Sequence, residues 1–161
     1  YNGSQMEKAA ALLADLKCPF VINQNRSSIF DRTIEQNGLK DSAATAGKGV
    51  ITFSPLAQGL LTNRYLHGVP EDSRIRTDGR FLKEQALTEE KLTRIKALNE
   101  IAMVRGESLA QMALKWILKD DVITSVLIGA SKPSQILENL KVLDSQPFTG
   151  EELAKIDEYS L

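Results

Sequence analysis

Apolar residues follow two patterns along the chain, one with the spacing of a helix and one in short continuous runs. Three runs of apolar, β-favouring residues predict buried strands, at residues 20–22, 50–53 and 125–128. Apolar positions three and four residues apart predict amphipathic helices, at residues 6–16, 92–102, 109–118, 136–143 and 153–159, with shorter helical pieces around residues 29–35 and 41–46. Alternating strands and helices of this kind predict an α/β fold with a parallel sheet.

Capping residues indicate where these helices begin. Ser4, Thr88 and Ser108 precede helical patterns and are expected N-caps, and Thr149 opens the last helix. Pro133 stands where a helix begins, a position that tolerates its missing N–H. These residues therefore mark where the predicted helices begin.

The stretch from residue 62 to 86 has little periodicity and is predicted to be a loop. A loop of that length in a compact domain is usually functional or mobile.

Three strands are too few to close a barrel. A complete (β/α)₈ barrel takes roughly 250 residues, and this chain has 161. The alternatives are a small open sheet or a piece of a larger barrel. The start at Tyr1-Asn2-Gly3-Ser4, which leads almost at once into a helix, favours the piece.

Composition excludes several classes of function. The chain is 42% apolar and 25% charged with a net charge of −1, an ordinary globular balance that argues against nucleic acid or an acidic membrane surface as partner. No apolar run approaches the ~20 residues that span a bilayer. The single Cys18 cannot form an internal disulfide and makes a zinc cluster improbable, which fits a reducing cytoplasm. Cys18 itself is expected to serve packing.

The residues that follow the strands have the chemistry of a binding site. Because parallel strands end on one side of a sheet, Gln24, Ser54 and Gly129-Ala130-Ser131 could line one pocket. The last of these turns leads into the helix at Pro133, where free N–H groups, the helix dipole and the charge of Lys132 suit a phosphate. An ordinary βα turn is the alternative. Arg64 and Arg74 could clamp a phosphate from above, whereas His67 has no orienting carboxylate nearby in sequence and is expected to be uninvolved.

Familiar catalytic signatures are absent from the sequence. It contains no G-x-G-x-x-G, P-loop, H-E-x-x-H or G-x-S-x-G pattern. Candidate binding groups are plentiful, but no convincing catalytic acid–base group stands out. The sequence therefore predicts no metal site and no catalytic residue of its own.

Two segments nevertheless resemble the aldo-keto reductase family. They are residues 53–61, FSPLAQGLL, followed by Tyr65, Gly68, Pro70 and Ser73-Arg74, and residues 126–140, VLIGASKPSQILENL. The nearest branch of the family includes bacterial L-glyceraldehyde 3-phosphate reductases and potassium-channel β subunits. The resemblance implies that residues 1–161 are a partial barrel, the C-terminal portion of a (β/α)₈ TIM barrel with about strands six to eight, and that residues 62–86 form a cofactor-proximal loop.

The resemblance also implies an NADP(H) site. Gln24 matches the residue that binds the nicotinamide carboxamide, and Phe53 matches the aromatic residue that stacks on the nicotinamide ring. The positions implied for the pyrophosphate are Ser54, Leu56, Ala57, Gln58 and Gly59, and those implied for basic contacts are Arg64 and Arg74. The positions implied for the adenosine-phosphate end are Gly129, Ser131, Gln135, Glu138 and Asn139.

Departures from the family pattern qualify this assignment. Ala130 and Gln135 stand where other reductases of the family carry basic residues for the 2′-phosphate, so a preference for NADP over NAD rests on Arg64 and Arg74. The family's Asp, Tyr, Lys and His tetrad lies on the first half of the barrel and is missing here. The residues Tyr1, Tyr65, Tyr159 and His67 do not match it.

The resemblance therefore predicts that this chain is half of an enzyme. The parent protein would be an NADP-dependent oxidoreductase that reduces aldehydes or ketones to alcohols, acting on a small carbonyl substrate, and this chain alone would be inactive. The alternatives are a nucleotide-binding regulatory or assembly subunit, and a truncated fragment without activity of its own. Assembly into a homo-oligomer stays open.

Overall fold

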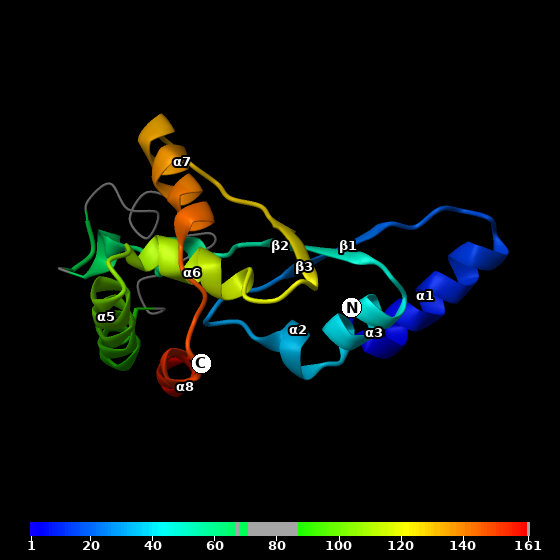
Figure 1. Ribbon diagram of the computed structural model, residues 1–161, viewed down its shortest axis with the longest axis horizontal. Coiled ribbons are helices and arrows are strands. Elements are labelled where there is room, and N and C mark those ends of the chain that lie inside the picture. The colour runs from blue at the N-terminus through cyan, green and yellow to red at the C-terminus, as the bar shows by residue number, and fades with distance from the viewer. Residues whose placement is uncertain (67, 71–86, 161) are drawn as a thin grey trace.

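A three-stranded parallel sheet lies at the centre of the protein. The computed structural model describes residues 1–66, 68–70 and 87–160. Strands β1 (Ile22–Arg26), β2 (Gly49–Phe53) and β3 (Ile123–Val126) lie side by side in that order, each parallel to its neighbour (Figure 1). The expected α/β fold with three parallel strands is therefore confirmed.

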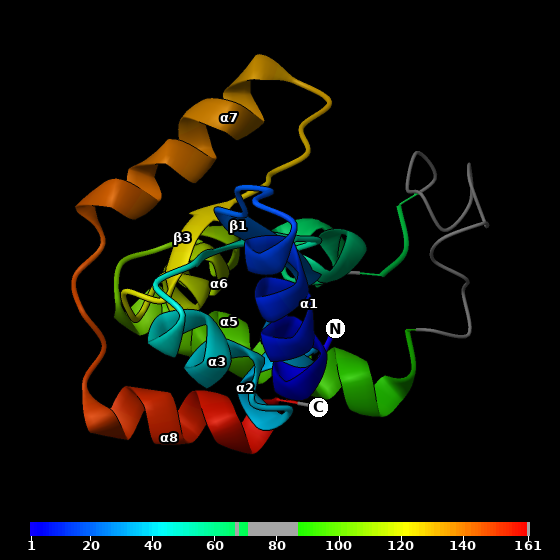
Figure 2. The same ribbon diagram turned by 90° about the vertical axis from the view of Figure 1, so that its right-hand side faces the viewer.

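Helices connect the strands. The connections are α2 (Thr33–Gln36) and α3 (Leu39–Thr45) between β1 and β2, and the single turns η1 (Ala57–Gly59) and η2 (Asn63–Tyr65) with α5 (Glu89–Val104) and α6 (Leu109–Ile117) between β2 and β3. The flanking elements are α1 (Gly3–Asp15) before the sheet, and α7 (Pro133–Leu140), η4 (Lys141–Asp144) and α8 (Gly150–Tyr159) after it. In both views α7 and α8 lie on opposite sides of the strands (Figures 1 and 2).

Most predicted helix starts are confirmed. The side chains of Thr88, Ser108 and Thr149 accept hydrogen bonds from backbone N–H groups in the first turns of α5, α6 and α8, and Pro133 is the first residue of α7. The expectation for Ser4 is wrong. Asn2 caps α1 instead, because its Oδ1 accepts from the Gln5 N–H at 2.9 Å while the Gln5 amide oxygen accepts from the Asn2 N–H at 3.0 Å.

Two strands differ from the predicted apolar runs. The first begins at Ile22 and continues through the polar residues as far as Arg26, so Gln24 lies in the strand rather than after it. The third begins at Ile123 and ends at Val126, and the apolar Leu127 that follows is exposed. The residues that pair with the backbone of β2 set both boundaries. Polar residues can make these backbone hydrogen bonds as well as apolar ones, so the strands need not coincide with the apolar runs.

One face of the sheet is buried and the other is open. Because side chains alternate along a strand, Val50, Thr52 and Ile123 point toward the helices and are almost fully buried. Gln24 and Phe53 belong to the opposite face and are exposed. This is the face that points inward when eight such strands close into a barrel. The chain thus forms a partial (β/α)₈ barrel whose inner face is uncovered by the described residues.

The remaining sequence expectations have mixed outcomes. Met112 and Trp116 of α6 are buried in the core, as their helical spacing predicts. The packing role expected for Cys18 is wrong, because this thiol is exposed. Among the described residues, no helix is both long and apolar enough to span a bilayer.

Candidate functional site

A large pocket opens beyond the carboxyl ends of β2 and β3. We call it the strand-end pocket, and its volume is about 950 Å³, near the upper end of the roughly 300–1,000 Å³ typical of small-molecule sites. Its walls come from the turn after β2, from η2, from the start of α6, and from the turn after β3 with α7. The lining residues are Ser54, Pro55, Leu56, Gln58, Gly59, Thr62, Asn63, Arg64, Tyr65, Ser108, Ala110, Leu127, Ile128, Gly129, Ser131, Lys132, Ser134, Gln135, Glu138 and Asn139.

The turn after β2 has an unusual backbone. Ser54, Ala57 and Gln58 have φ angles of 56°, 47° and 62°, and Gly59 follows at 95°. A residue with a Cβ costs about 1 kcal/mol or more in this left-handed region. Hydrogen bonds hold the turn: the Gly59 N–H donates to the Leu56 carbonyl at 2.8 Å, and the Thr62 hydroxyl donates to the Gly59 carbonyl at 2.7 Å. Such strain gathers at binding and catalytic sites more than elsewhere.

Hydrogen-bond donors converge at the start of α7. The amide oxygen of Gln135 accepts from the Ser131 N–H at 2.8 Å, the Ser131 hydroxyl at 3.2 Å and the Lys132 N–H at 3.3 Å. Three donors aimed at one oxygen, at the positive end of a helix, form the kind of surroundings that an anionic oxygen prefers. In this structure the oxygen belongs to the protein's own side chain.

The lining of the strand-end pocket carries more positive than negative charge. Arg64 and Lys132 bring positive charge to its lining, and Glu138 brings a carboxylate. The Glu138 carboxylate is already paired with the Lys141 amine at 2.7 Å. The pocket therefore presents a net positive lining, which favours an anionic ligand.

The structure brings most of the predicted site residues together. Those that line the strand-end pocket are Ser54, Leu56, Gln58, Gly59, Arg64, Gly129, Ser131, Gln135, Glu138 and Asn139. Gln24 and Phe53 do not line it but lie on the open face of the sheet, where Phe53 directly precedes Ser54. Ala57 lies in the same turn as Gln58 without lining the pocket. Arg74 and His67 fall outside the described residues, and so does most of the predicted loop at 62–86.

Sequence reasoning missed several residues of the pocket wall. Ser108 and Ala110, at the start of α6, border it because α6 packs against β3 and α7. Thr62 and Asn63 border it because η2 folds the chain back after β2. Both lie at the start of the predicted cofactor-proximal loop at 62–86, although neither was singled out as a site residue. For the α6 residues no local signal exists, since their place depends on long-range packing.

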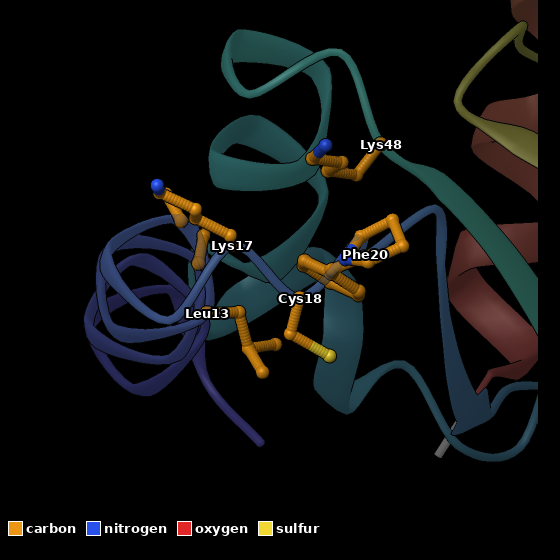
Figure 3. A pocket seen from close by; sticks show the side chains of 8 residues that line it. Leu13, Lys17, Cys18, Phe20 and Lys48 are labelled. Carbon is orange, nitrogen blue, oxygen red and sulfur yellow. The ribbon is translucent and has the colours of Figure 1, made fainter.

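A smaller pocket lies between α1 and the chain that enters β1 (Figure 3). Its volume is about 510 Å³, and its lining residues are Ala10, Leu13, Ala14, Lys17, Cys18, Pro19, Phe20 and Lys48. The Lys48 amine lies 5.5 Å from the centre of the Phe20 ring, and the Cys18 sulfur points away from both lysine amines. Because its polar groups do not converge, we assign this pocket no ligand. Throughout the described part of the chain, no three His, Cys, Asp or Glu side chains could share a metal ion.

Comparison with known proteins identifies the family. The family model described as Aldo/keto reductase family matches residues 1–160. The chain belongs to the aldo-keto reductase family. The L-glyceraldehyde 3-phosphate reductase of Escherichia coli K12 is 45% identical over 162 residues, and a probable voltage-gated potassium channel subunit beta of Oryza sativa is 36% identical over 140 residues. These alignments cover 99% and 85% of this chain.

Solved structures of aldo-keto reductases share the fold. A glycerol dehydrogenase from Gluconobacter oxydans gives a TM-score of 0.68 at 26% identity, covering 86% of this chain and 41% of its own. An aldo-keto reductase from Bacillus halodurans, in its holo form, gives 0.66 at 24% identity, covering 94% and 47%. The chain also spans about half the length of the curated relatives it matches, 47% of the E. coli protein and 43% of the rice protein. It corresponds to part of a complete aldo-keto reductase barrel.

Proposed function

We propose that this chain is the cofactor-binding half of an NADP(H)-dependent oxidoreductase that reduces aldehydes or ketones to alcohols. The observation that carries the proposal is the strand-end pocket, in which the strained turn after β2 and the donor-rich turn after β3 face one space. A dinucleotide needs phosphate-binding donors next to a surface for its nicotinamide ring. The open face of the sheet, with exposed Phe53, adjoins the first of these turns.

The residues of the pocket suit such a cofactor. Hydroxyl and amide groups of Ser131 and Asn139 can bind the ribose and the adenine, and the cations Arg64 and Lys132 can offset phosphate charge. Gly129 has no heavy atom within 4 Å of the position that a Cβ would take, so its backbone stays accessible to a ligand. The volume of about 950 Å³ accommodates the adenosine and the phosphates, with the nicotinamide on the sheet beyond.

Each side chain would then have a defined role. When bound, NADPH supplies the hydride for carbonyl reduction. Phe53 supports the nicotinamide ring from the sheet, and the Gln24 amide on the neighbouring strand binds its carboxamide and fixes which ring face is presented. The backbone of the turn from Ser54 to Gly59 binds the pyrophosphate. These contacts orient the cofactor, which is the contribution expected of the protein in such reactions.

The proton donor for the alcohol would come from the polypeptide that supplies the remaining strands. The exposed side chains described on the open face include Gln24, Phe53 and Ser125, none of which is a general acid near neutral pH. Tyr65 lines the strand-end pocket but is almost fully buried, and Tyr159 lies on α8, which packs against α5. The named activities of the relatives, a glyceraldehyde 3-phosphate reductase and a glycerol dehydrogenase, support a small polyol-related carbonyl compound as substrate.

Titration with NADPH tests the proposal. Trp116 is the only tryptophan of the chain, so energy transfer from its emission to the reduced nicotinamide reports binding. We expect saturable binding that is weakened by Gly59→Ala, because Gly59 has a φ of 95° beside the pocket. Gly106→Ala introduces a comparable strain at a φ of 72° just after α5, outside the pocket lining, and should leave binding unchanged. Absence of saturable binding would contradict the proposal.

An activity assay tests whether the proton donor comes from the remaining strands. The chain alone should not reduce a simple aldehyde with NADPH, whereas a polypeptide that also contains the first five strands should do so. Turnover by the chain alone would show that our account of the proton donor is wrong.

The second candidate function is a nucleotide-binding regulatory or assembly subunit. The similarity to the rice potassium channel subunit beta favours it, as does a second one, 40% identical over 116 residues, from Schizosaccharomyces pombe. A full-length parent that binds NADPH tightly but reduces no carbonyl compound would support this alternative. A parent of the same length as this chain would support a fragment without activity of its own.

A further inference from the structure

Arg26 places a positive charge on the open face of the sheet. It is the last residue of β1 and pairs in register with Phe53 of β2. Because side chains alternate along a strand, Arg26 shares the face of Gln24 and Phe53, whereas Asn25 belongs to the face that the helices cover and is buried. The Arg26 side chain is 53% exposed. This cation therefore stands at the carboxyl end of the open face, next to the ring proposed to support the nicotinamide.

The fold supplies Arg26 with little negative charge. The Asp31 carboxylate lies 3.7 Å from the Arg26 Nε, a separation that makes an ion pair but is too long for a hydrogen bond. The same carboxylate accepts hydrogen bonds from the Thr33 N–H at 3.3 Å and the Thr33 hydroxyl at 2.8 Å. Within the described part of the chain, no other carboxylate pairs with Arg26 and its guanidinium makes no hydrogen bond. Its N–H groups are thus available to an incoming anion.

The position of Arg26 in a complete barrel makes a further counter-charge necessary. The open face of the sheet is the one that points inward when the barrel closes. The remaining strands would then enclose Arg26 together with Gln24 and Phe53. A guanidinium withdrawn from water is costly unless an anion is within hydrogen-bond distance. An anion bound inside the barrel mouth meets this requirement.

The order of the strands separates Arg26 from the proposed phosphate contacts. β2 lies between β1 and β3 (Figure 1), and the strand-end pocket opens beyond β2 and β3. Arg26 is not among the residues that line this pocket. It lies on the other side of Phe53, toward the strands that would bring the proton donor. Because the reacting carbonyl must lie between the nicotinamide and the proton donor, Arg26 is on the substrate side of the cofactor.

We propose that Arg26 binds an anionic group of the substrate and makes this protein selective for carbonyl compounds that carry a carboxylate or a phosphate. This inference rests on the proposed function. A guanidinium suits the task because two of its N–H groups can donate in parallel to two oxygens of a carboxylate or phosphate. The ion pair with Asp31 holds the side chain near the end of β1. The substrate's charge would then fix the direction from which its carbonyl approaches the nicotinamide.

Nuclear magnetic resonance on this chain, saturated with NADP⁺, tests the contact. The Nε–H signal of Arg26 is identified by its absence from Arg26→Met and is followed during titration with glycerol 3-phosphate, 4-hydroxybutyrate and glycerol. The first two are the alcohols formed from an aldehyde with a phosphate and from an aldehyde with a carboxylate. We expect a saturable shift with one or both anions, which identifies the anionic group, and none with glycerol. A signal that neither anion shifts would overturn the inference.

Kinetics of a polypeptide that also contains the first five strands test the selectivity. The substrates are glyceraldehyde 3-phosphate and succinic semialdehyde, each compared with a neutral aldehyde, glyceraldehyde or butanal. For the aldehyde whose anion binds, we expect Arg26→Met to lower kcat/KM about tenfold or more, chiefly through KM, with less than about a twofold effect on the neutral aldehydes. Arg26→Lys should keep part of the preference. Lys96→Met, which removes an exposed lysine of α5, should change none of these values.

The outcomes separate the two proposals. If Arg26→Met weakens NADPH as much as it weakens the anionic aldehyde, the guanidinium contacts the cofactor, and this inference fails while the cofactor site stands. Equal losses for charged and neutral aldehydes would mean that Arg26 pairs with the remaining strands, which would overturn the inference as well. If the wild type reduces none of the aldehydes, the proposed function fails and this inference fails with it.

Discussion

Replacing Gln135 by glutamate separates two roles that its side chain can have at the start of α7. The amide oxygen caps the helix by accepting from two backbone N–H groups and one hydroxyl. Because the amide is planar, its NH₂ group then points away from those donors, and the residue lines the strand-end pocket. Glutamate has the same shape and keeps the capping oxygen, but it replaces the NH₂ donor by a negatively charged acceptor.

The expected magnitudes follow from these contacts. A hydrogen bond from the NH₂ group to a phosphate is worth about 1.5–3 kcal/mol, so its loss weakens NADPH by about tenfold or more, and repulsion between the carboxylate and the phosphate adds to the loss. Glutamate at the third position of a helix is itself a good capping residue. The free energy of unfolding should therefore change by less than about 0.5 kcal/mol. In Gln135→Ala the cap is lost too, which costs about 1 kcal/mol of stability.

Gln5 offers a matched control. It occupies the same capping position in α1, where its amide oxygen accepts from the Asn2 N–H, but it is not among the residues that line the strand-end pocket. Affinity for NADPH is measured by calorimetry and stability by urea unfolding, for Gln135→Glu and Gln5→Glu in parallel. We expect NADPH affinity to fall in the first variant alone. If Gln135→Glu binds NADPH as tightly as Gln5→Glu does, Gln135 does not face the cofactor and our reasoning about the site is refuted.

Three further predictions concern the scaffold that holds the site. Arg105→Ala should lower the free energy of unfolding by about 3–5 kcal/mol in urea denaturation, because the buried guanidinium pairs with Glu107 and with Glu152 at 2.8 Å. Burial raises the pKa of the Glu35 carboxyl, but Lys119 and other cations lower it by more, to below its ordinary 4.5. The stability that Glu35 contributes is thus complete above the unfolded-state pKa and disappears as acid titration passes through the folded-state pKa. Thr52→Val should raise the melting temperature and stabilise by about 1 kcal/mol, since the Thr52 hydroxyl is buried without a hydrogen-bond partner in the described structure.

Controls separate these effects from general damage. Lys155→Ala breaks an exposed pair with Glu151 and should leave the free energy of unfolding almost unchanged. An equally small effect of Arg105→Ala would contradict the role of that residue. Glu35→Gln should reduce the loss of folding stability below about pH 4.5. If the dependence of stability on pH is the same in this variant, Glu35 is not the group responsible for that loss. Thr124→Val alters an exposed hydroxyl and should not stabilise. A destabilised Thr52→Val would mean that its hydroxyl has a partner.

The sequence predicted the helices well because their signals are local. A capping side chain such as Thr88 or Ser108 acts on residues two or three positions ahead, so its effect is visible in a short window. Asn2 and Ser4 both stand near the start of α1, and the choice between them depends on whether Gln5 or another side chain completes the capping box. Adjacent candidates of equal propensity cannot be ranked by propensity alone.

The strands and the pocket depend on contacts that are distant in sequence. β1 includes the polar Gln24 because β2 pairs with its backbone, and the inner face of an incomplete barrel need not be apolar. The left-handed φ angles of Ala57 and Gln58 have no signature in those residue types, which normally avoid this region. The rule that parallel strands end on one side of a sheet already predicted that Ser54 and Gly129-Ala130-Ser131 line one pocket, and the resemblance to a family added further residues of both turns. The contribution of Ser108 to this pocket required the three-dimensional structure.

The most direct test of a dinucleotide site at the strand ends is a map of backbone amide chemical shifts during titration with NADPH. We predict that the amides of residues 54, 56–59 and 129–132 shift together and saturate with one dissociation constant, while those of Cys18 and Lys48 in the smaller pocket stay in place. Shifts centred on Cys18 and Lys48, or saturation of the two turns with different constants, would contradict a single dinucleotide site at the strand ends.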